Sequence, residues 1–217
     1  MLARAMKNAG RLAIVLSLSL PAAACVQPVH KVARDESFMK PEAGRNAWRK
    51  VAVLPFTGEP AFRRVAAEWF AFRLHKHGFF EVVDPFFAEI ELKKKGILFG
   101  EAAATVEEVR KAGELLGVDG VVSGSVDPVP VQRGVAIAPV VNAKLVDLAT
   151  GKVVADSALS FPAWLLGRRQ ERMIDAVDRI AEDFAPLFYA AAGKPWTPPP
   201  KTELEGQETQ ASDPALR

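Results

Sequence analysis

Few side chains in this sequence have types and spacings that suit chemistry. Cys25 is the single cysteine, His75 and His77 are two residues apart, and Ser123 and Ser125 lie among glycines. Two histidines at that spacing on a helix point in different directions and make a poor metal pair. The serines have no sequence hint of an adjacent base, which a nucleophilic serine needs. We expect no catalytic residue, metal or cofactor, with a serine hydrolase as a minor alternative.

Cys25 stands at the end of a pattern typical of an export signal. The apolar run 12–20 is followed by Pro21 and three alanines, and it is preceded by three basic residues, Arg4, Lys7 and Arg11. A basic start, a short apolar run and small residues describe a signal peptide. The run is far below the ~20 residues that a membrane-spanning helix needs.

The four residues Ala22-Ala23-Ala24-Cys25 resemble a bacterial lipobox. The resemblance implies that residues 1–24 are removed and that acylated Cys25 binds the protein to outer-membrane lipid. In lipoproteins of the enteric type, aspartate after the cysteine signals retention in the inner membrane, so Val26 indicates the outer membrane, facing the periplasm. The alternative is an ordinary secretory signal that ends near a cysteine.

Composition and charge narrow the class of protein. The chain has 28 Lys and Arg against 26 Asp and Glu, and the 3 basic residues before Cys25 leave 25 in the mature chain. Its net charge is then about −1, whereas a nucleic-acid binder carries a concentrated basic surface. We therefore expect no nucleic-acid partner.

The two ends of the mature chain differ in composition from its middle. Residues 25–49 mix charges with prolines and Gly44, without an apolar period, and are predicted to be a lipidated tether with a span of ~25–30 Å. Residues 193–217 are polar and proline-rich and are predicted to be a disordered tail. Residues 50–192 remain as one folded domain.

The domain reads as alternating strands and helices followed by a hairpin. Short β-branched or apolar runs predict strands over 51–56, 79–83, 118–126, 135–148 and 152–161. Helical spacing predicts helices over 60–76, 86–95, 105–116 and 167–192. The order β-α-β-α-α-β-β-β-α indicates an α/β fold, a mixed-sheet sandwich with helices on both faces.

Several positions within these elements carry sharper predictions. Thr105 and Glu108 form a capping-box pattern, and Pro128 is expected to end the third strand. The inward face of the first helix is predicted as Phe62, Val65, Ala66, Trp69 and Phe72 or Arg73. The apolar stripe of the last helix is predicted as Met173, Ile174, Val177, Ile180, Ala181, Phe184 and Phe188.

Four segments in order resemble the motifs of one lipoprotein superfamily. They are Lys50-Val-Ala-Val-Leu-Pro-Phe56, Gly78-Phe-Phe-Glu-Val-Val-Asp84, Leu116-Gly-Val-Asp-Gly-Val-Val-Ser-Gly-Ser125 and Ala143-Lys-Leu-Val-Asp-Leu-Ala-Thr-Gly-Lys152. Together they are similar to the CsgG/LpoB/PelC-like superfamily of bacterial lipoproteins, which has a TolB N-terminal-like fold. The resemblance implies a periplasmic, non-enzymatic domain that assembles or docks at the outer membrane.

One apolar cluster stands outside the predicted core pattern. Phe161, Trp164, Leu165 and Leu166 lie between the last strand and the last helix. They either plug the core at that junction or form a loop that touches a membrane or another subunit, since tryptophan suits interfaces.

Two functional hypotheses follow. The first is a component of an envelope export or assembly complex that acts by self-association. The second is a monomeric adapter or activator that contacts a cell-envelope synthase.

Overall fold

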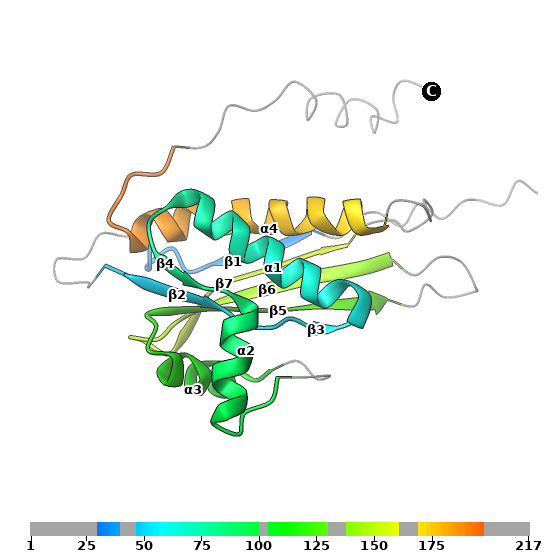
Figure 1. Cartoon of the computed structure of the whole chain (residues 1–217). Helices are drawn as coiled ribbons and strands as arrows, with labels where there is room; N and C mark the ends of the chain where they lie inside the picture. The colour runs from blue at the N-terminus through cyan, green and yellow to red at the C-terminus, as the bar shows by residue number, and fades with distance from the viewer. Residues whose placement is uncertain (1–29, 40–46, 100–103, 130–137, 161–168, 198–217) are drawn as a thin grey trace, which may run out of the picture.

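In the part of the chain that the structure describes, four helices pack in two layers against one mixed β-sheet (Figure 1). The computed structural model describes residues 30–39, 47–99, 104–129, 138–160 and 169–197. The strands are β1 (His30–Arg34), β2 (Lys50–Val53), β3 (Thr57–Gly58), β4 (Glu81–Val83), β5 (Gly120–Val129), β6 (Ala138–Asp147) and β7 (Lys152–Ser160). The helices are α1 (Pro60–His77), α2 (Pro85–Lys94), α3 (Val106–Leu116) and α4 (Arg169–Ala191).

The sheet has seven strands in the order β1-β7-β6-β5-β2-β4, and the two-residue β3 also pairs with β5. Strand β2 lies parallel to both β4 and β5. Strands β5, β6, β7 and β1 are antiparallel to one another in succession. Parallel strands need a crossover, which helices provide here, whereas antiparallel strands can follow one another through tight turns. The predicted mixed α/β class is confirmed.

Each face of the sheet buries its own apolar cluster. Helices α1 and α4 cover one face, and α2 and α3 cover part of the other (Figure 1). Fully buried side chains on the α1/α4 face include Phe70, Leu74, Ile180, Phe184 and Phe188. The smaller α2/α3 cluster contains Leu54, Leu92, Val109 and Val121. The prediction of helices on both faces is therefore confirmed.

Local chemistry explains why the helices begin and end where they do. The Thr105 hydroxyl accepts a hydrogen bond from the Glu108 N–H, and the Glu108 carboxylate accepts one from the Thr105 N–H at 2.7 Å. This reciprocal capping box satisfies two backbone donors at the start of α3. Gly117 ends α3 with φ of 64°, a left-handed conformation that glycine adopts without strain. Both features agree with the sequence pattern.

The sequence interpretation of the amino-terminal segment differs from the structure. The stretch predicted as a tether, residues 25–49, contributes β1 to the sheet and buries Phe38 and Trp48, which are 3% and 6% exposed. The segment His30–Arg34 has three basic residues and no apolar alternation. It gains strand structure by pairing with β7, a long-range contact that no local pattern announces.

Two further expectations are corrected. Phe72 is 53% exposed, whereas Ala66 is buried and Phe62, Val65 and Trp69 pack against the core as predicted. The centre of the buried face of α1 lies at Ala67, Phe70 and Leu74, which the prediction omitted. Apolar residues lie on several sides of α1, and contact with the sheet and α4 selects one of them. Strand β5 also continues through Pro128, which lies opposite Pro139 of β6. The apolar stripe predicted for α4 is confirmed, apart from Ile174, which is half-buried.

Candidate functional site

The functional residues predicted from the sequence lie outside the described part of the chain. Cys25, and likewise Phe161, Trp164, Leu165 and Leu166, belong to segments 1–29 and 161–168. The structure does describe the residues that adjoin these two segments. Those residues show where each segment joins the domain.

Both segments join the same end of the sheet. His30, the first residue of β1, lies opposite Leu159, and Ser160 is the last residue of β7. Four residues lie between Cys25 and His30, and residues 161–168 connect Ser160 to α4. We call this end of the domain, marked by His30 and Ser160, the anchor end.

The carboxyl-terminal end of α4 lies at the opposite end of the sheet. The Trp48 N–H donates to the Ala191 carbonyl at 3.0 Å, close to where β2 begins. Trp48 also packs against Phe38 and Phe80, with ring centroids 5.4 and 6.2 Å apart. Beyond α4, the Lys194 ammonium lies 4.1 Å from the centre of the Phe79 ring. The first described residue, His30, and the residues that follow α4 therefore lie at opposite ends of the sheet.

Strand β1 is held to α4 through one carboxylate. Asp183 is 13% exposed, and its oxygens lie 2.8 Å from His30 Nε2 and 3.5 Å from Arg34 Nη2. The Ser157 hydroxyl of β7 donates to the same carboxylate at 2.9 Å. Asp183 thus joins β1, β7 and α4. The sequence suggests none of this, because Asp183 reads as an ordinary polar residue of an amphipathic helix.

The serines considered as nucleophiles lie on the α2/α3 side of the sheet. A cavity of about 280 Å³ there is lined by Ser123 and Ser125 among other residues. The Ser125 hydroxyl donates to the Asp127 carboxylate and accepts from Asn142 Nδ2 at 2.7 Å. No histidine lines this cavity. Ser125 is therefore satisfied by hydrogen bonds, and it lacks the imidazole base of a common hydrolase.

The paired histidines lie at the carboxyl-terminal end of α1. His75 is exposed, while the His77 ring is half-buried between Phe79 and Tyr189, with centroids 5.9 and 5.8 Å away. Burial lowers the pKa of His77, and the charges of Arg73 and Lys76 lower it further. Among the described residues, no cluster of three or more His, Cys, Asp or Glu side chains could hold a metal ion.

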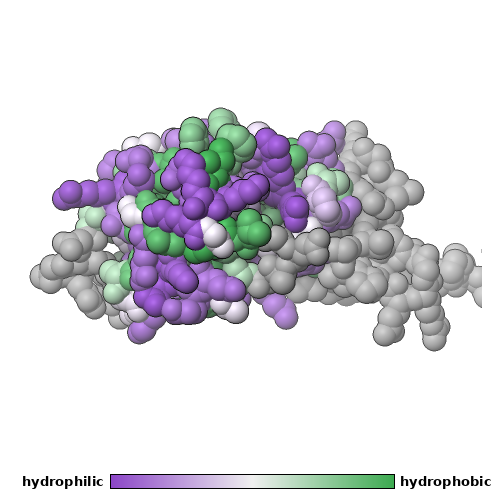
Figure 2. All heavy atoms as spheres, turned by 60° about the horizontal axis from the view of Figure 1, so that its bottom comes forward, coloured by the Kyte–Doolittle hydropathy of each residue, from purple (hydrophilic) through white to green (hydrophobic). Residues whose placement is uncertain are grey.

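Several large apolar side chains are exposed near α2. Phe86, Phe87 and Leu98 are 54%, 61% and 77% exposed. Figure 2 brings forward the side of the molecule that lies at the bottom of Figure 1, where α2 is found, and shows apolar surface divided there by hydrophilic side chains. A groove of about 250 Å³ between α1 and α2 is lined by Phe86 together with Arg63 and Arg64. None of the helices in the described residues has the length and apolar character to cross a membrane.

Similarity to known proteins is found in structure and not in sequence. No protein-family model matches the sequence, and no curated protein matches it. Among solved structures, the chain is similar to a PelC dodecamer from Paraburkholderia phytofirmans at 19% identity and a TM-score of 0.45. That match covers 74% of this chain and 97% of the other.

Two further solved structures are also similar to this chain. The LpoB C-terminal domain from Escherichia coli is 17% identical, with a TM-score of 0.40, covering 58% of this chain and 90% of the other. The lipoprotein GNA1162 from Neisseria meningitidis is 19% identical, with a TM-score of 0.37, covering 61% and 98%. PelC and LpoB, two of the lipoproteins after which the predicted superfamily is named, are thus among the solved structures to which this chain is similar.

Proposed function

We propose that this protein is a non-enzymatic, outer-membrane-anchored periplasmic lipoprotein that acts by self-association in an envelope export or assembly complex. The observation that carries the membrane-anchoring part of this proposal is that β1 begins only five positions after Cys25. Five extended residues span at most about 18 Å. Acylated Cys25 would hold the anchor end near the bilayer surface, closer than the ~25–30 Å expected of a free 25-residue tether.

The same geometry gives the apolar cluster after β7 a role. The segment that carries Phe161, Trp164, Leu165 and Leu166 follows Ser160, the last residue of β7 at the anchor end, and precedes α4 in the chain. Tryptophan and leucine suit the boundary between a bilayer and water, or a contact between subunits. We therefore propose that this segment touches the membrane or a neighbouring subunit.

A change in the length of the segment between Cys25 and β1 tests the orientation of the domain relative to the membrane. Inserting about twelve Gly and Ser residues between Pro28 and Val29 raises the root-mean-square reach of this segment from about 12 to about 23 Å. In vesicles that contain brominated phospholipid, we expect Trp164 fluorescence to be quenched in the acylated protein. The Trp164→Phe variant isolates that signal, and the insertion should reduce it. Equal quenching with and without the insertion would contradict the proposal that the short segment after Cys25 holds the anchor end near the bilayer.

The native mass of the detergent-extracted, acylated protein tests self-association. The Cys25→Ala protein serves as the soluble, unacylated control. One large species would support the assembly hypothesis. A monomer at concentrations matching those in the membrane would contradict it and favour the second function.

The second function is a monomeric adapter or activator that contacts a cell-envelope synthase. The exposed Phe86, Phe87 and Leu98 favour it, because apolar surface bordered by polar residues is typical of a protein interface. Crosslinking from Phe87 replaced by a photoreactive residue tests this function. Capture of a synthase, lost on Phe86→Ser, would support the adapter, whereas crosslinks to this chain alone would support self-association.

A further inference from the structure

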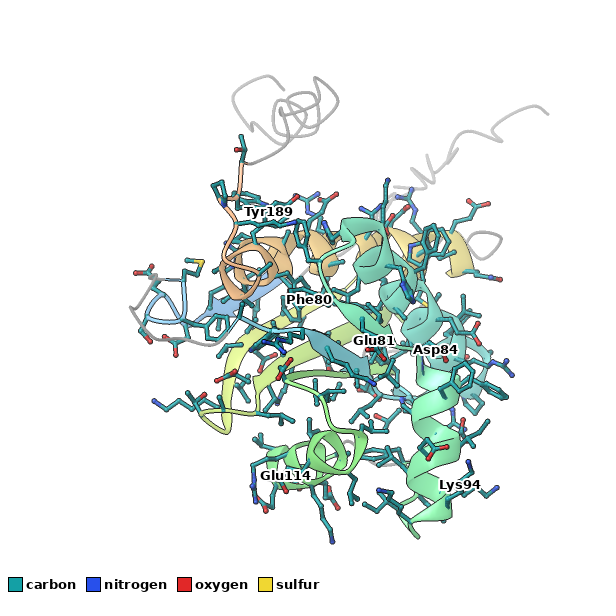
Figure 3. All side chains as sticks on the ribbon, turned by 60° about the vertical axis from the view of Figure 1, so that its left-hand side comes forward. Phe80, Glu81, Asp84, Lys94, Glu114 and Tyr189 are labelled. Atoms are coloured by element: carbon teal, nitrogen blue, oxygen red, sulfur yellow. The ribbon has the colours of Figure 1, made fainter. Side chains whose placement is uncertain are left out.

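The sheet has two edges that remain unpaired among the described residues. Strand β1 forms one edge, beyond β7, and β4 forms the other, beyond β2. All five residues of β1 are exposed, and in β4 Glu81 is exposed while Val82 and Val83 are half-buried. Phe80, Glu81 and Asp84 mark the course of β4 in Figure 3. Such edges present backbone N–H and C=O groups that can pair with another strand.

The two edges carry opposite charge. Strand β1 contains His30, Lys31 and Arg34, and it is followed by Asp35, which accepts hydrogen bonds from Ser37, and by Glu36. Strand β4 contains Glu81, whose side chain is 69% exposed, and is followed by Asp84. Asp183 offsets part of the β1 charge, and Lys50 lies 2.7 Å from Glu81. The remaining charges attract one edge to the other and repel like edges, which selects partners more than it adds affinity.

On each edge strand, the central residue points its backbone N–H and C=O groups away from the sheet, so the two edges can pair through these residues. The Asp35 N–H donates to the Val154 carbonyl at 2.8 Å, so alternation along β1 turns the backbone groups of Val32 away from β7. The Glu81 N–H donates to the Arg49 carbonyl at 2.9 Å, so the backbone groups of Val82 point away from β2. Both edges therefore present a valine at their centre.

The side chains of these valines also share one face. Val82 packs against the α1/α4 cluster. Val32 lies opposite Ser157, whose hydroxyl contacts Asp183 of α4. An antiparallel pair with Val32 opposite Val82 keeps the two faces continuous. It also places Lys31 diagonally across from Glu81, within reach of an ion pair.

The direction of the strands decides which edges can pair. Strand β4 is parallel to β5, and three successive antiparallel steps lead from β5 to β1. Strands β1 and β4 of one molecule therefore run in opposite directions. Antiparallel pairing of β1 with β4 of another copy leaves both anchor ends on the same side, so both can reach one membrane. Antiparallel pairing of two β1 strands would point the anchor ends in opposite directions.

From this arrangement we propose that β1 of one copy pairs with β4 of the next, so that the sheets continue from subunit to subunit along the membrane surface. Contacts between unlike edges repeat and produce a ring or an open chain. This inference rests on the proposed lipid anchor and self-association. It adds the surface and register by which the copies meet.

Disulfide trapping in the full-length, acylated protein tests the register. The native thiol of Cys25 is consumed by acylation, so introduced cysteines have no competing partner. Val32→Cys with Val82→Cys should give a ladder of crosslinked multimers under mild oxidation, because paired strand residues have suitable Cα separations. The control Val32→Cys with Phe72→Cys, which uses an exposed site away from β4, should give about tenfold less.

A charge exchange provides a second arm that does not depend on crosslinking. Lys31→Glu should reduce the native mass, and adding Glu81→Lys should restore it. If the native protein is oligomeric but trapping fails and the charge exchange has no effect, this interface is wrong while self-association stands. If the acylated protein is a monomer, self-association and this interface fail together. A β1–β1 crosslink from Val32→Cys alone that exceeds the double variant would also overturn the proposed pairing.

Discussion

His30 Nε2 lies 2.8 Å from an Asp183 oxygen, although the two residues are 153 positions apart. Asp183 also accepts a hydrogen bond from the fully buried Ser157 and lies within reach of Arg34. One carboxylate of α4 therefore holds both the edge strand that follows the predicted anchor and the strand beside it. The packing of β1 against the rest of the domain at the anchor end depends on this contact.

Replacement of Asp183 should weaken the attachment of β1. Asp183→Ala leaves the Ser157 hydroxyl without its acceptor, which costs about 1–3 kcal/mol of unfolding free energy. Urea unfolding of the soluble Cys25→Ala protein measures this loss. The exposed neighbour Glu182 provides a matched control, since Glu182→Ala should change stability by about 0.5 kcal/mol or less. Equal effects of the two variants would contradict the role of Asp183.

The contact between Trp48 and Asp147 should stabilise the opposite end of the sheet. Trp48 Nε1 donates to Asp147 Oδ1 at 3.0 Å, and the other Asp147 oxygen accepts from the Thr150 N–H and hydroxyl. Asp147→Ala should cost about 2–3 kcal/mol, because it leaves a buried indole N–H unpaired and removes the turn contacts. Thr150→Val removes the hydroxyl alone and should cost less. Thermal and urea unfolding can rank the two variants, and the reverse order would contradict the prediction.

Gly120 should tolerate no side chain while Trp48 is present. A Cβ added at Gly120 would lie 2.5 Å from the Trp48 ring. Gly120→Ala should therefore cost about 1–3 kcal/mol through overpacking. A double-mutant cycle with Trp48→Leu separates this clash from other effects of alanine. We expect Gly120→Ala to be less costly in the Trp48→Leu background, and additive effects would exclude the clash as the cause.

Stability should fall on acidification because of His77. Its pKa is lowered in the folded state, mainly by burial, so the unfolded state binds the proton more readily. Stability from the neutral ring is present above the unfolded pKa of about 6.5 and is lost as the pH falls below it. Melting temperatures at pH 8 and pH 5 should differ less in His77→Gln than in the wild type. His75→Gln controls for loss of a histidine from the same helix turn; a matching change there would contradict the assignment.

Local patterns predicted most of the helices and strands because their causes are local. The capping box of Thr105 and Glu108 and the apolar stripe through Val177 and Phe184 can be read from spacing alone. The centre of the buried face of α1 could not be chosen in this way. Phe72 and Phe70 are equally apolar in sequence, and packing against the sheet and α4 buries Phe70.

The candidate functional site divides in the same way. Cys25 and its export pattern depend on contiguous residues, so the sequence by itself determined that prediction, and Trp164 remains a prediction from composition. The pairing of β1 with β7 and the contact of β1 with Asp183 required the tertiary structure. These features join residues more than a hundred positions apart. Their energy comes from sheet pairing and a partly buried carboxylate, which have no local signature in the chain.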